Sequence, residues 1–464
     1  MNEGGKDVEA LLSNPRKAIL HMAVPLFFTY LIARLQSFID GVWCSGLGPD
    51  PLSAISISAP IYTIIISVGM ALGVGASASI ARYIGSGDKG RADRIASLSM
   101  VLTLLASVIS MPIIYLAAEP IIQVSGGGYN VGISMDYIMP FIICILPLMF
   151  NGLLTGLFRG EGAAKKSTIV SVSASLINIV LDPIMIYSFD MGVVGAAWAT
   201  CISFIVVTVA GFAWYLRGDS YITPHLEGVR FERVLLIDMA AISIPMIIEG
   251  VLSRLIIAPE QGLVVSCGGA DGLVVYIYAF AYSDLAMIPV MAITAALIPV
   301  VSAQLGQGDP DKVMGSFRYS FKLATVIGIL MGVLLFVFAD QLVYLYTYSE
   351  DMSHLHDEMA LALRIFSITP LINGLIRVCI SMVQALRKAL LSTVLMFSRE
   401  LVFLSFYWFA ARISMEAIYW SVDAVNVIML AVAAAVVYAV LRTELPKIRK
   451  RDSEGGPEGG SAIS

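Results

Sequence analysis

Two polar side chains interrupt an otherwise apolar stretch of the chain, "SLINIVLDPIMIY", at residues 175–187. They are Asn178 and Asp182, and Pro183 follows directly. On a helix, Ser171 shares a face with both, because the three residues are spaced by seven and then four positions. Proline has no backbone N–H, so one carbonyl of the preceding turn loses its helical partner. Carboxylate, amide, hydroxyl and carbonyl oxygens together suit a hard cation such as Na⁺, and a carboxylate also takes a proton.

The composition identifies the surroundings of these groups as a membrane. Of the 464 residues, 58% are hydrophobic and only 14% are charged, whereas about a quarter of a soluble protein is charged. A helix of roughly 20 apolar residues crosses a bilayer. The five cysteines have no paired spacing, which predicts neither a disulfide framework nor a zinc site.

We predict an all-α integral membrane protein with twelve transmembrane helices. Basic residues gather in alternate connecting loops, so the positive-inside rule places both termini in the cytoplasm of a multi-pass plasma-membrane protein. The predicted spans are 18–43, 52–83, 94–118, 131–157, 168–188, 191–217, 234–262, 272–304, 319–345, 359–386, 390–411 and 417–441.

The chain also repeats itself at a spacing of about 220 residues. "YIGSGDKGRADR" is echoed by "QLGQGDPDKVMG", "VPLFFTYLIARLQSFID" by "IPMIIEGVLSRLIIAPE", and "KKSTIV" by "LLSTVL". Six spans per repeat give both halves the same orientation, as in transporters with parallel repeats. We therefore expect two pseudo-symmetric lobes around a central cavity. The predicted divisions are an N-terminal lobe at 1–217, a linker at 218–233, a C-terminal lobe at 234–445 and a disordered tail at 446–464.

Four polar residues are predicted to lie at a similar depth in the membrane. With the N-terminus inside, Asp40 and Asp182 lie late in outward-running helices, and Tyr137 and Thr200 lie early in inward-running ones. All four fall in the outer half of the first lobe, which indicates a shared site, since intramembrane carboxylates usually serve function. The alternatives are that Asp182 only bonds a neighbouring helix, and that Tyr137 and Thr200 are packing residues.

The second repeat does not preserve this site. The positions equivalent to the helix 5 pair are Phe403 and Tyr407, and only the counterpart of Asp40, Glu260, stays acidic. The ion site is therefore predicted in the first lobe. For the other charges of the second lobe we expect mutual pairing or a place in the cavity lining, with pairing favoured. These charges are Glu249, Arg254, Asp284, Arg377 and Arg399.

Four segments carry a family resemblance. They are "SFIDGVWCSGLGPDPLSAISIS", "LLTGLFRGEGAAKKSTIV", "NIVLDPIMIYSFDMGVVGAAWATCIS" and "SRELVFLSFYWF". They resemble the multidrug and toxic compound extrusion (MATE) family, and the likeness extends from about residue 15 to about residue 445. An acidic helix 1 and Asn-x-x-x-Asp in helix 5 look most like its archaeal and DinF-type branch. The absence of an aspartate in helix 10 argues against the mechanism of the other branch.

The resemblance implies roles for particular residues. It implies a cation site, for H⁺ or Na⁺, at Asp40, Asn178, Asp182 and Thr200, with Tyr137 lining the same cavity. Gln36 stands where relatives often have a tyrosine, in the polar network. Glu161, in "RGEG", matches a family residue that binds substrate or closes a gate, and a solvated loop charge is the alternative. Glu260 is placed with the substrate cavity.

The leading hypothesis is a secondary active antiporter that exports organic, often cationic, compounds in exchange for H⁺ or Na⁺ by alternating access. The sequence has no ATP-binding motif, so an ion gradient must supply the energy, and no cofactor is expected. Expected partners are small organic substrates and membrane lipids, without nucleic acid, for a protein acting as a monomer. The alternative within the same superfamily is a lipid-linked oligosaccharide flippase.

An intramembrane enzyme is the hypothesis from another class. The two GxGD strings resemble a motif of aspartyl proteases, but Asp88 and Asp309 fall in basic loops, where we expect them to cap the next helix. There is no HExxH string, P-loop or paired-carboxylate motif of the prenyltransferase kind. We therefore expect that the protein is not an enzyme.

Overall fold

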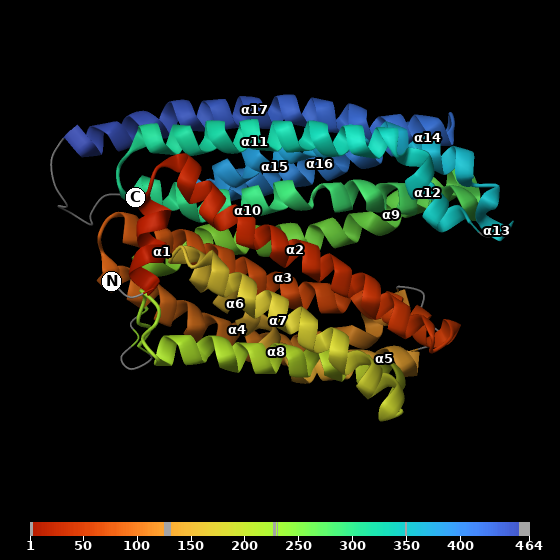
Figure 1. Cartoon of the computed structure of the whole chain (residues 1–464), viewed down its shortest axis with the longest axis horizontal. Coiled ribbons are helices and arrows are strands. Elements are labelled where there is room, and N and C mark those ends of the chain that lie inside the picture. Colours follow the sequence, from red (N-terminus) through yellow and green to blue (C-terminus); the bar gives the residue numbers. More distant parts are fainter. Residues whose placement is uncertain (1–2, 125–130, 226–228, 230, 349, 454–464) are drawn as a thin grey trace.

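The computed structural model describes residues 3–124, 131–225, 229, 231–348 and 350–453, and the regular elements in these ranges are all helices (Figure 1). The helices are α1 Glu3–Leu12, α2 Pro15–Ser45, α3 Pro49–Gly85, α4 Lys89–Val124, α5 Val131–Ile143, α6 Ile145–Gly160, α7 Ala164–Pro183, the π-helix η1 Ile184–Ser188, α8 Gly192–Leu216, α9 Arg233–Ala286, α10 Ile288–Gly306, α11 Pro310–Val337, α12 Ala339–Thr347, α13 Glu350–Ser353, α14 His356–Phe366, α15 Thr369–Ala385, α16 Ala389–Ala410 and α17 Met415–Ser453.

Among the described residues, twelve helical segments are long and apolar enough to cross a membrane, as predicted. The pair α5 and α6, bent by 55°, also qualifies when taken as one span. The prediction had one straight helix there, whereas the structure breaks it at Cys144. Helix α9 is kinked at Gly269, whose φ of 65° and ψ of −155° are open mainly to glycine. The second part of α9 ends at Ala286, and α10 begins at Ile288. The predicted span 272–304 therefore covers the end of α9 and most of α10, which count as two of the twelve segments.

Two lobes make up the molecule, as predicted (Figure 1). Helices α2 to α8 form the first lobe and α9 to α17 the second. Helix α2 packs against α7 of its own lobe and against α10 of the other. Helix α1 and the last turns of α17 lie at the same end of the bundle, which we call the terminal end.

Glycines allow α3 and α6 to approach closely. Gly69 and Gly73 of α3 face Gly152 and Gly156 of α6, and a Cβ on Gly156 would overlap the backbone of Gly73. Spacing of small residues by four positions lets two membrane helices touch backbone to backbone, where dispersion forces hold them together. This contact forms the rigid centre of the first lobe.

We therefore expect Gly156→Ala to destabilise the protein by a few kcal/mol, since backbone cannot move aside as a flexible side chain can. Gly262→Ala is the matched control, because no atom lies within 4 Å of a Cβ added there. That change should be neutral or stabilise by up to about 1 kcal/mol. Thermal unfolding in detergent measures both, and equal melting temperatures for the two variants would contradict the packing argument.

At the terminal end the two lobes are closed against each other. A Cβ on Gly85 of α3 would overlap the carbonyl of Ala303 in α10, and one on Gly306 would overlap the carbonyl of Arg82. Asp309 caps α11 by accepting hydrogen bonds from backbone N–H groups. Asp88 accepts a hydrogen bond from the N–H of Arg91 at 2.9 Å. The predicted capping role of both GxGD aspartates is confirmed.

A buried carboxylate joins the lobes at this closed end. Asp238 of α9 is 4% exposed. It accepts hydrogen bonds from the guanidinium groups of Arg82, in the first lobe, and Arg387, in the second. The hydroxyl of Tyr83 donates a further bond, at 2.6 Å. One carboxylate thus takes three donors, and two of them come from the opposite lobe.

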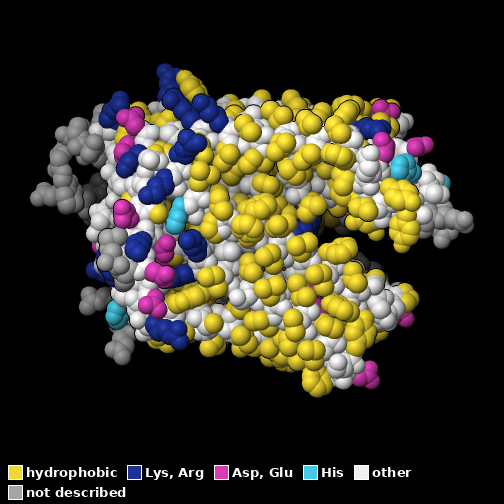
Figure 2. All heavy atoms as spheres, in the orientation of Figure 1, with side chains coloured by type: hydrophobic (Ala, Val, Ile, Leu, Met, Phe, Trp, Pro, Cys, Tyr) yellow, Lys and Arg dark blue, Asp and Glu magenta, His cyan; other side chains and the backbone are white. Residues whose placement is uncertain are grey.

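The opposite end of the molecule is hollowed between the lobes. Figure 2 shows a notch there, while most Lys, Arg, Asp and Glu side chains visible in this view gather at the terminal end. Between these ends the surface is mainly hydrophobic. Such a belt is what a lipid bilayer requires of the helices it surrounds.

Candidate cation-binding site

Asn178 is the centre of a polar cluster between α2, α7 and α8. It is 0% exposed. Its amide nitrogen donates to Asp182 Oδ1 at 2.9 Å and to Thr200 Oγ1 at 3.2 Å. Its amide oxygen accepts a hydrogen bond from Gln36 Nε2. The structure therefore brings together side chains that are 22 to 142 positions apart in the chain.

The two carboxyl groups of the cluster are neighbours. Asp40 of α2 lies within interaction distance of Asp182, which is 1% exposed. Asp40 Oδ1 is buried and has no hydrogen-bond partner among the described residues. No lysine or arginine in the described ranges forms an ion pair with either group. Two like charges in apolar surroundings need a proton or a cation between them, so the arrangement can bind either.

The helix changes its form directly after the site. Helix α7 ends at Pro183, and the π-helical turn Ile184–Ser188 follows, with the N–H of Phe189 bonded to the carbonyl of Ile184 at 3.0 Å. Proline removes one donor from the helical ladder, and π-turns often accompany functional sites. The loosened backbone therefore adjoins Asp182.

Tyr137, which its depth predicts to share the site, lies within electrostatic range of the two carboxyls. Its ring contacts Phe141 at a centroid distance of 5.3 Å, and it interacts electrostatically with Asp40 and Asp182. Sequence reasoning missed Cys44 and Tyr62, which also lie within electrostatic range of the site. Cys44 follows Asp40 by one helical turn, and that spacing was the available signal.

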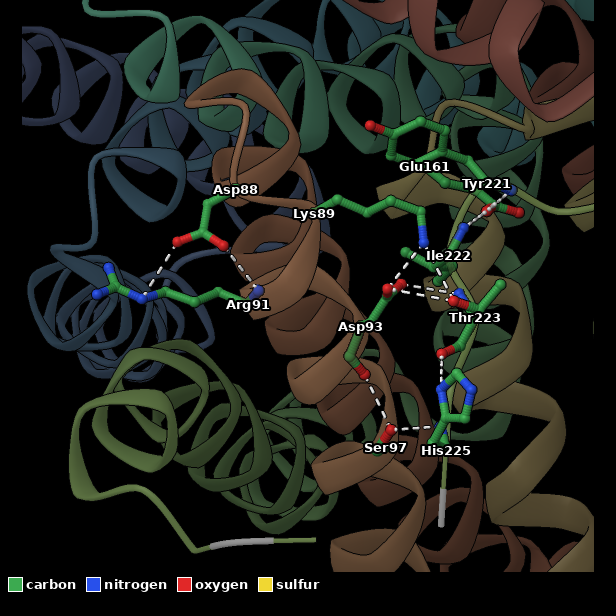
Figure 3. Close-up of polar contacts among 10 residues, drawn as sticks. All are labelled: Asp88, Lys89, Arg91, Asp93, Ser97, Glu161, Tyr221, Ile222, Thr223 and His225. Carbon is green, nitrogen blue, oxygen red and sulfur yellow. Dashed lines mark hydrogen bonds and ion pairs between the residues drawn. The ribbon is translucent and has the colours of Figure 1, made fainter. Parts of the chain in front are cut away.

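Glu161 lies apart from this cluster, at the terminal end, just after α6. Figure 3 shows it beside the segment that links the lobes. Its Oε2 accepts hydrogen bonds from the N–H groups of Tyr221 at 2.9 Å and Ile222 at 3.1 Å. Its Oε1 is buried and has no partner among the described residues. The solvated alternative does not apply, because the residue is 0% exposed.

Asp93 of α4 holds the same segment a little further along (Figure 3). It accepts from the N–H of Thr223 at 2.8 Å and from Lys89 Nζ at 2.8 Å. Ser97 Oγ accepts from the N–H of His225 at 2.9 Å. Side chains of the first lobe thus take up the backbone donors of this part of the linker, as buried or half-buried N–H groups require.

Burial raises the pKa of Glu161 to about 7, while the two N–H groups and Lys166 act in the opposite direction. The ordinary value, 4.5, applies once the linker is released and the carboxyl is hydrated. The raised value means that the docked linker favours the protonated acid. Docking is therefore strongest below pH 4.5 and weakens as the pH rises to about 7, by at most on the order of 3 kcal/mol.

We expect amide exchange at Tyr221 and Ile222 to speed up between pH 5 and pH 7.5 beyond the intrinsic rate. In Glu161→Gln, which cannot titrate, that extra pH dependence should vanish. Asp219→Asn is the matched control, since the side chain of Asp219 is exposed and in the same segment. Hydrogen–deuterium exchange by mass spectrometry measures all three proteins. Identical pH profiles for wild type and Glu161→Gln would refute the argument.

Glu260 belongs to a separate network in the second lobe. It accepts a hydrogen bond from Tyr276 at 2.7 Å, and the hydroxyl of Tyr276 is 2.7 Å from that of Tyr407. Tyr407 is 0% exposed and takes the place of the aspartate of the first lobe. The second lobe therefore has one carboxyl where the first has two.

The other charges of the second lobe are only partly paired. Asp284 accepts from Arg34 of α2 at 3.4 Å, so its partner comes from the first lobe. Arg399 lies 3.2 Å from Glu400. Neither Glu249 nor Arg377 forms an ion pair with a described residue. The side chain of Arg254 lies outside the described residues.

In the described part of the chain no three His, Cys, Asp or Glu side chains are grouped as for a transition metal. The oxygen donors of the Asn178 cluster, two carboxyls with an amide and a hydroxyl, suit a proton or an alkali cation. A membrane-spanning bundle of two lobes, with charged groups at its centre and a hollow at one end, is the architecture of a membrane transporter.

Comparison with known proteins gives the family. The MatE family model matches residues 25–184 and 236–409, which is more than half of the chain. The chain belongs to this family, and it is a transporter rather than an enzyme, as predicted.

Its relatives include multidrug export proteins and an FAD transporter. It is 26% identical over 273 residues to the multidrug export protein MepA of Staphylococcus saprophyticus, covering 58% of this chain and 57% of that protein. It is 22% identical over 381 residues to MepA of Staphylococcus aureus, covering 80% and 81%. It is 27% identical over 358 residues to an FAD transporter of Shewanella oneidensis, covering 74% and 77%.

Solved structures agree in fold. A crystal structure of MATE in complex with MaL6 has a TM-score of 0.90 and 28% identity, covering 96% of this chain and 99% of that one. A second structure is a MOP superfamily transporter from Pyrococcus furiosus, whose binding pocket is said to have reverse polarity. It has a TM-score of 0.89 and 28% identity, covering 96% of this chain and 99% of that one.

Proposed function

We propose that this protein is a secondary active antiporter that exports organic compounds in exchange for H⁺ or Na⁺. The observation that carries the proposal is the adjacent pair Asp40 and Asp182, without a cationic partner in the described ranges: Asp182 is buried and bonded to Asn178, and Asp40 is half-buried with its Oδ1 enclosed. The two carboxylates repel each other, and binding of a proton or a cation relieves that repulsion. An ion gradient can therefore drive it, and its relatives named MepA are multidrug exporters.

The lobes supply the two states that transport requires. In the present state the terminal end is closed through Asp238, and the hollow is open at the other end. We assign the terminal end to the cytoplasm of a plasma-membrane protein, following the charge bias of the loops. Ion entry from outside neutralises the carboxylates, α2 bends near Pro25, where the helical ladder lacks one donor, and the compound leaves through the hollow.

The remaining predicted residues take supporting roles in this scheme. Gln36 and Tyr137 orient the ion site. Thr200 completes its oxygen donors, and would be a ligand of Na⁺ with Asn178. Glu161 controls the linker between the lobes, which favours the gate over the substrate cavity for this residue. Glu260 lies in the second lobe, where we assign it to the polar network.

One chain holds both lobes, so we propose a monomer that acts among membrane lipids. The proposed boundaries are the first lobe at 1–217, the linker at 218–233 and the second lobe at 234–445. The relatives carry different compounds, multidrug exporters beside an FAD transporter. Membership of the family therefore does not define the compound that this protein exports.

Gradient-driven efflux tests the antiporter. We expect proteoliposomes with wild-type protein to export ethidium under an imposed pH or Na⁺ gradient. Asp40→Asn and Asp182→Asn should each reduce that rate at least tenfold, because neither amide can exchange a proton or balance a cation. Glu416→Gln, at the exposed start of α17, is the control and should transport normally.

Each gradient identifies its own ion. Efflux under a pH gradient alone indicates H⁺, and efflux under a Na⁺ gradient alone indicates Na⁺. Normal transport by both aspartate variants would refute the site. No efflux under either gradient, with folded protein, would refute the antiporter and favour the lipid-linked oligosaccharide flippase, which accumulation of lipid intermediates after gene deletion would support.

The closed terminal end gives a second test. Asp238→Asn should shift the population toward states open at this end, because an amide cannot satisfy two guanidinium groups. Spin labels on Ser86 and Asp311, in a cysteine-free background, report the distance between the lobes there. Asp340→Asn is the control, since its ion pair with Arg364 is within the second lobe and exposed. An unchanged distance distribution in Asp238→Asn would contradict the closing role.

A further inference from the structure

The two lobes present different charges to the space between them. In the first lobe the Asn178 cluster contains two carboxyls and no basic group. The second lobe contributes arginines as well as acids at the same seam. Figure 2 shows dark-blue basic side chains within the hollow, separate from those at the terminal end. Arginines inside a membrane protein are expensive and are expected to serve substrate or structure.

Arg377 of α15 is the arginine without a partner. Its Nε is buried and forms no hydrogen bond with a described residue. It lies within electrostatic range of Glu249 and Asp284, yet neither is within ion-pair distance of it. Asp284 is already bonded to Arg34. The donors of Arg377 are therefore available to a bound group.

The two other arginines of this region are already occupied. Arg399 is bonded to Glu400 and to Asn426, and its guanidinium lies 4.8 Å above the ring of Phe403. Arg34 is bonded to Asp284, and both side chains are about half exposed, at 48% and 53%. The guanidinium of Arg34 is therefore already engaged by a carboxylate.

An unpartnered acid lies in the same region. Glu249 Oε2 is buried and has no partner among the described residues. The next residue, Gly250, faces Ser67 of α3 across the seam, with 3.3 Å between an added Cβ and the serine Cβ. Glu249 therefore lies where the lobes meet. A separated acid and base, each without a partner, can hold the two ends of a zwitterion.

We propose that Arg377 binds the anionic group, a carboxylate or a phosphate, of the exported compound, with Glu249 facing its cationic group. The proposal rests on the proposed export function and adds the class of substrate, a zwitterionic or anionic organic compound. The planar guanidinium donates two parallel hydrogen bonds to either anion, which a lysine cannot do. When the anionic group leaves water and binds Arg377, it also removes the energetic cost of leaving that arginine unpaired.

Equilibrium binding to the full-length protein in detergent tests this without any gradient. Norfloxacin carries a carboxylate and a protonated amine, and its ethyl ester keeps only the amine. We expect wild type to bind the acid at least tenfold more tightly than the ester. In Arg377→Gln the acid should bind as weakly as the ester, whose own affinity should change less than twofold. Arg377→Lys should recover part of the difference, because charge returns without the planar fork.

Riboflavin 5′-phosphate against riboflavin makes the same comparison for phosphate, so the two pairs show which anion is preferred. Arg412→Gln is the control, since Arg412 is exposed and stacks on Trp408. It should leave both ratios unchanged. The proposal is overturned if wild type binds neither acid nor phosphate better than its uncharged partner, or if Arg377→Gln weakens acid and ester equally. The wild-type ratios decide the question even if the variant does not fold.

Asp182→Asn separates this proposal from the antiporter. It should abolish gradient-driven efflux while the ratio of acid to ester binding stays within twofold. Efflux that fails in wild type, with the binding ratio intact, would refute the coupling alone. A ratio near one, with efflux intact, would refute the role of Arg377 alone.

Discussion

The structure depends on two neighbouring carboxyl groups, one buried and one half-buried, that have no basic partner among the described residues. Asp182 is almost fully buried, and the hydrogen-bond partners around it are neutral. Two other buried acids of the molecule have donors around them. Asp238 has two guanidinium groups, and Glu161 has backbone donors. Asp182 and Asp40 have no basic partner in the described part of the chain, so added positive charge stabilises this pair.

Permanent and breakable contacts lie at different places. The backbone contact of α3 with α6 is within one lobe and depends on shape, so the lobe moves as a unit. The contacts between the lobes at the terminal end combine the ion pairs of Asp238 with close backbone approaches at Gly85 and Gly306. An ion-paired seam can open when water replaces its partners, whereas close-packed backbone gains nothing from water. The alternating access that we propose requires the ion pairs of the seam to break while each lobe keeps its packing.

Duplication explains the similarity of the lobes but not their chemistry. The helices repeat, whereas the helix 5 aspartate of the first lobe is Tyr407 in the second. The second lobe instead mixes arginines and acids near the seam. In the proposals made above, this divergence assigns the ion to one half of the scaffold and the exported compound to the other.

The sequence alone predicted a bundle of membrane helices and the family, because the bilayer requires long apolar runs; the duplication remains a prediction from the repeated segments. It also indicated Asp40, Asn178 and Asp182, because charge in such runs is rare. Only the tertiary structure decided which side chains meet. It placed Glu161 on the linker, paired Asp284 with Arg34 and left Arg377 without a partner. Spacing along a helix fixes a face, but the partner of that face depends on how distant helices pack.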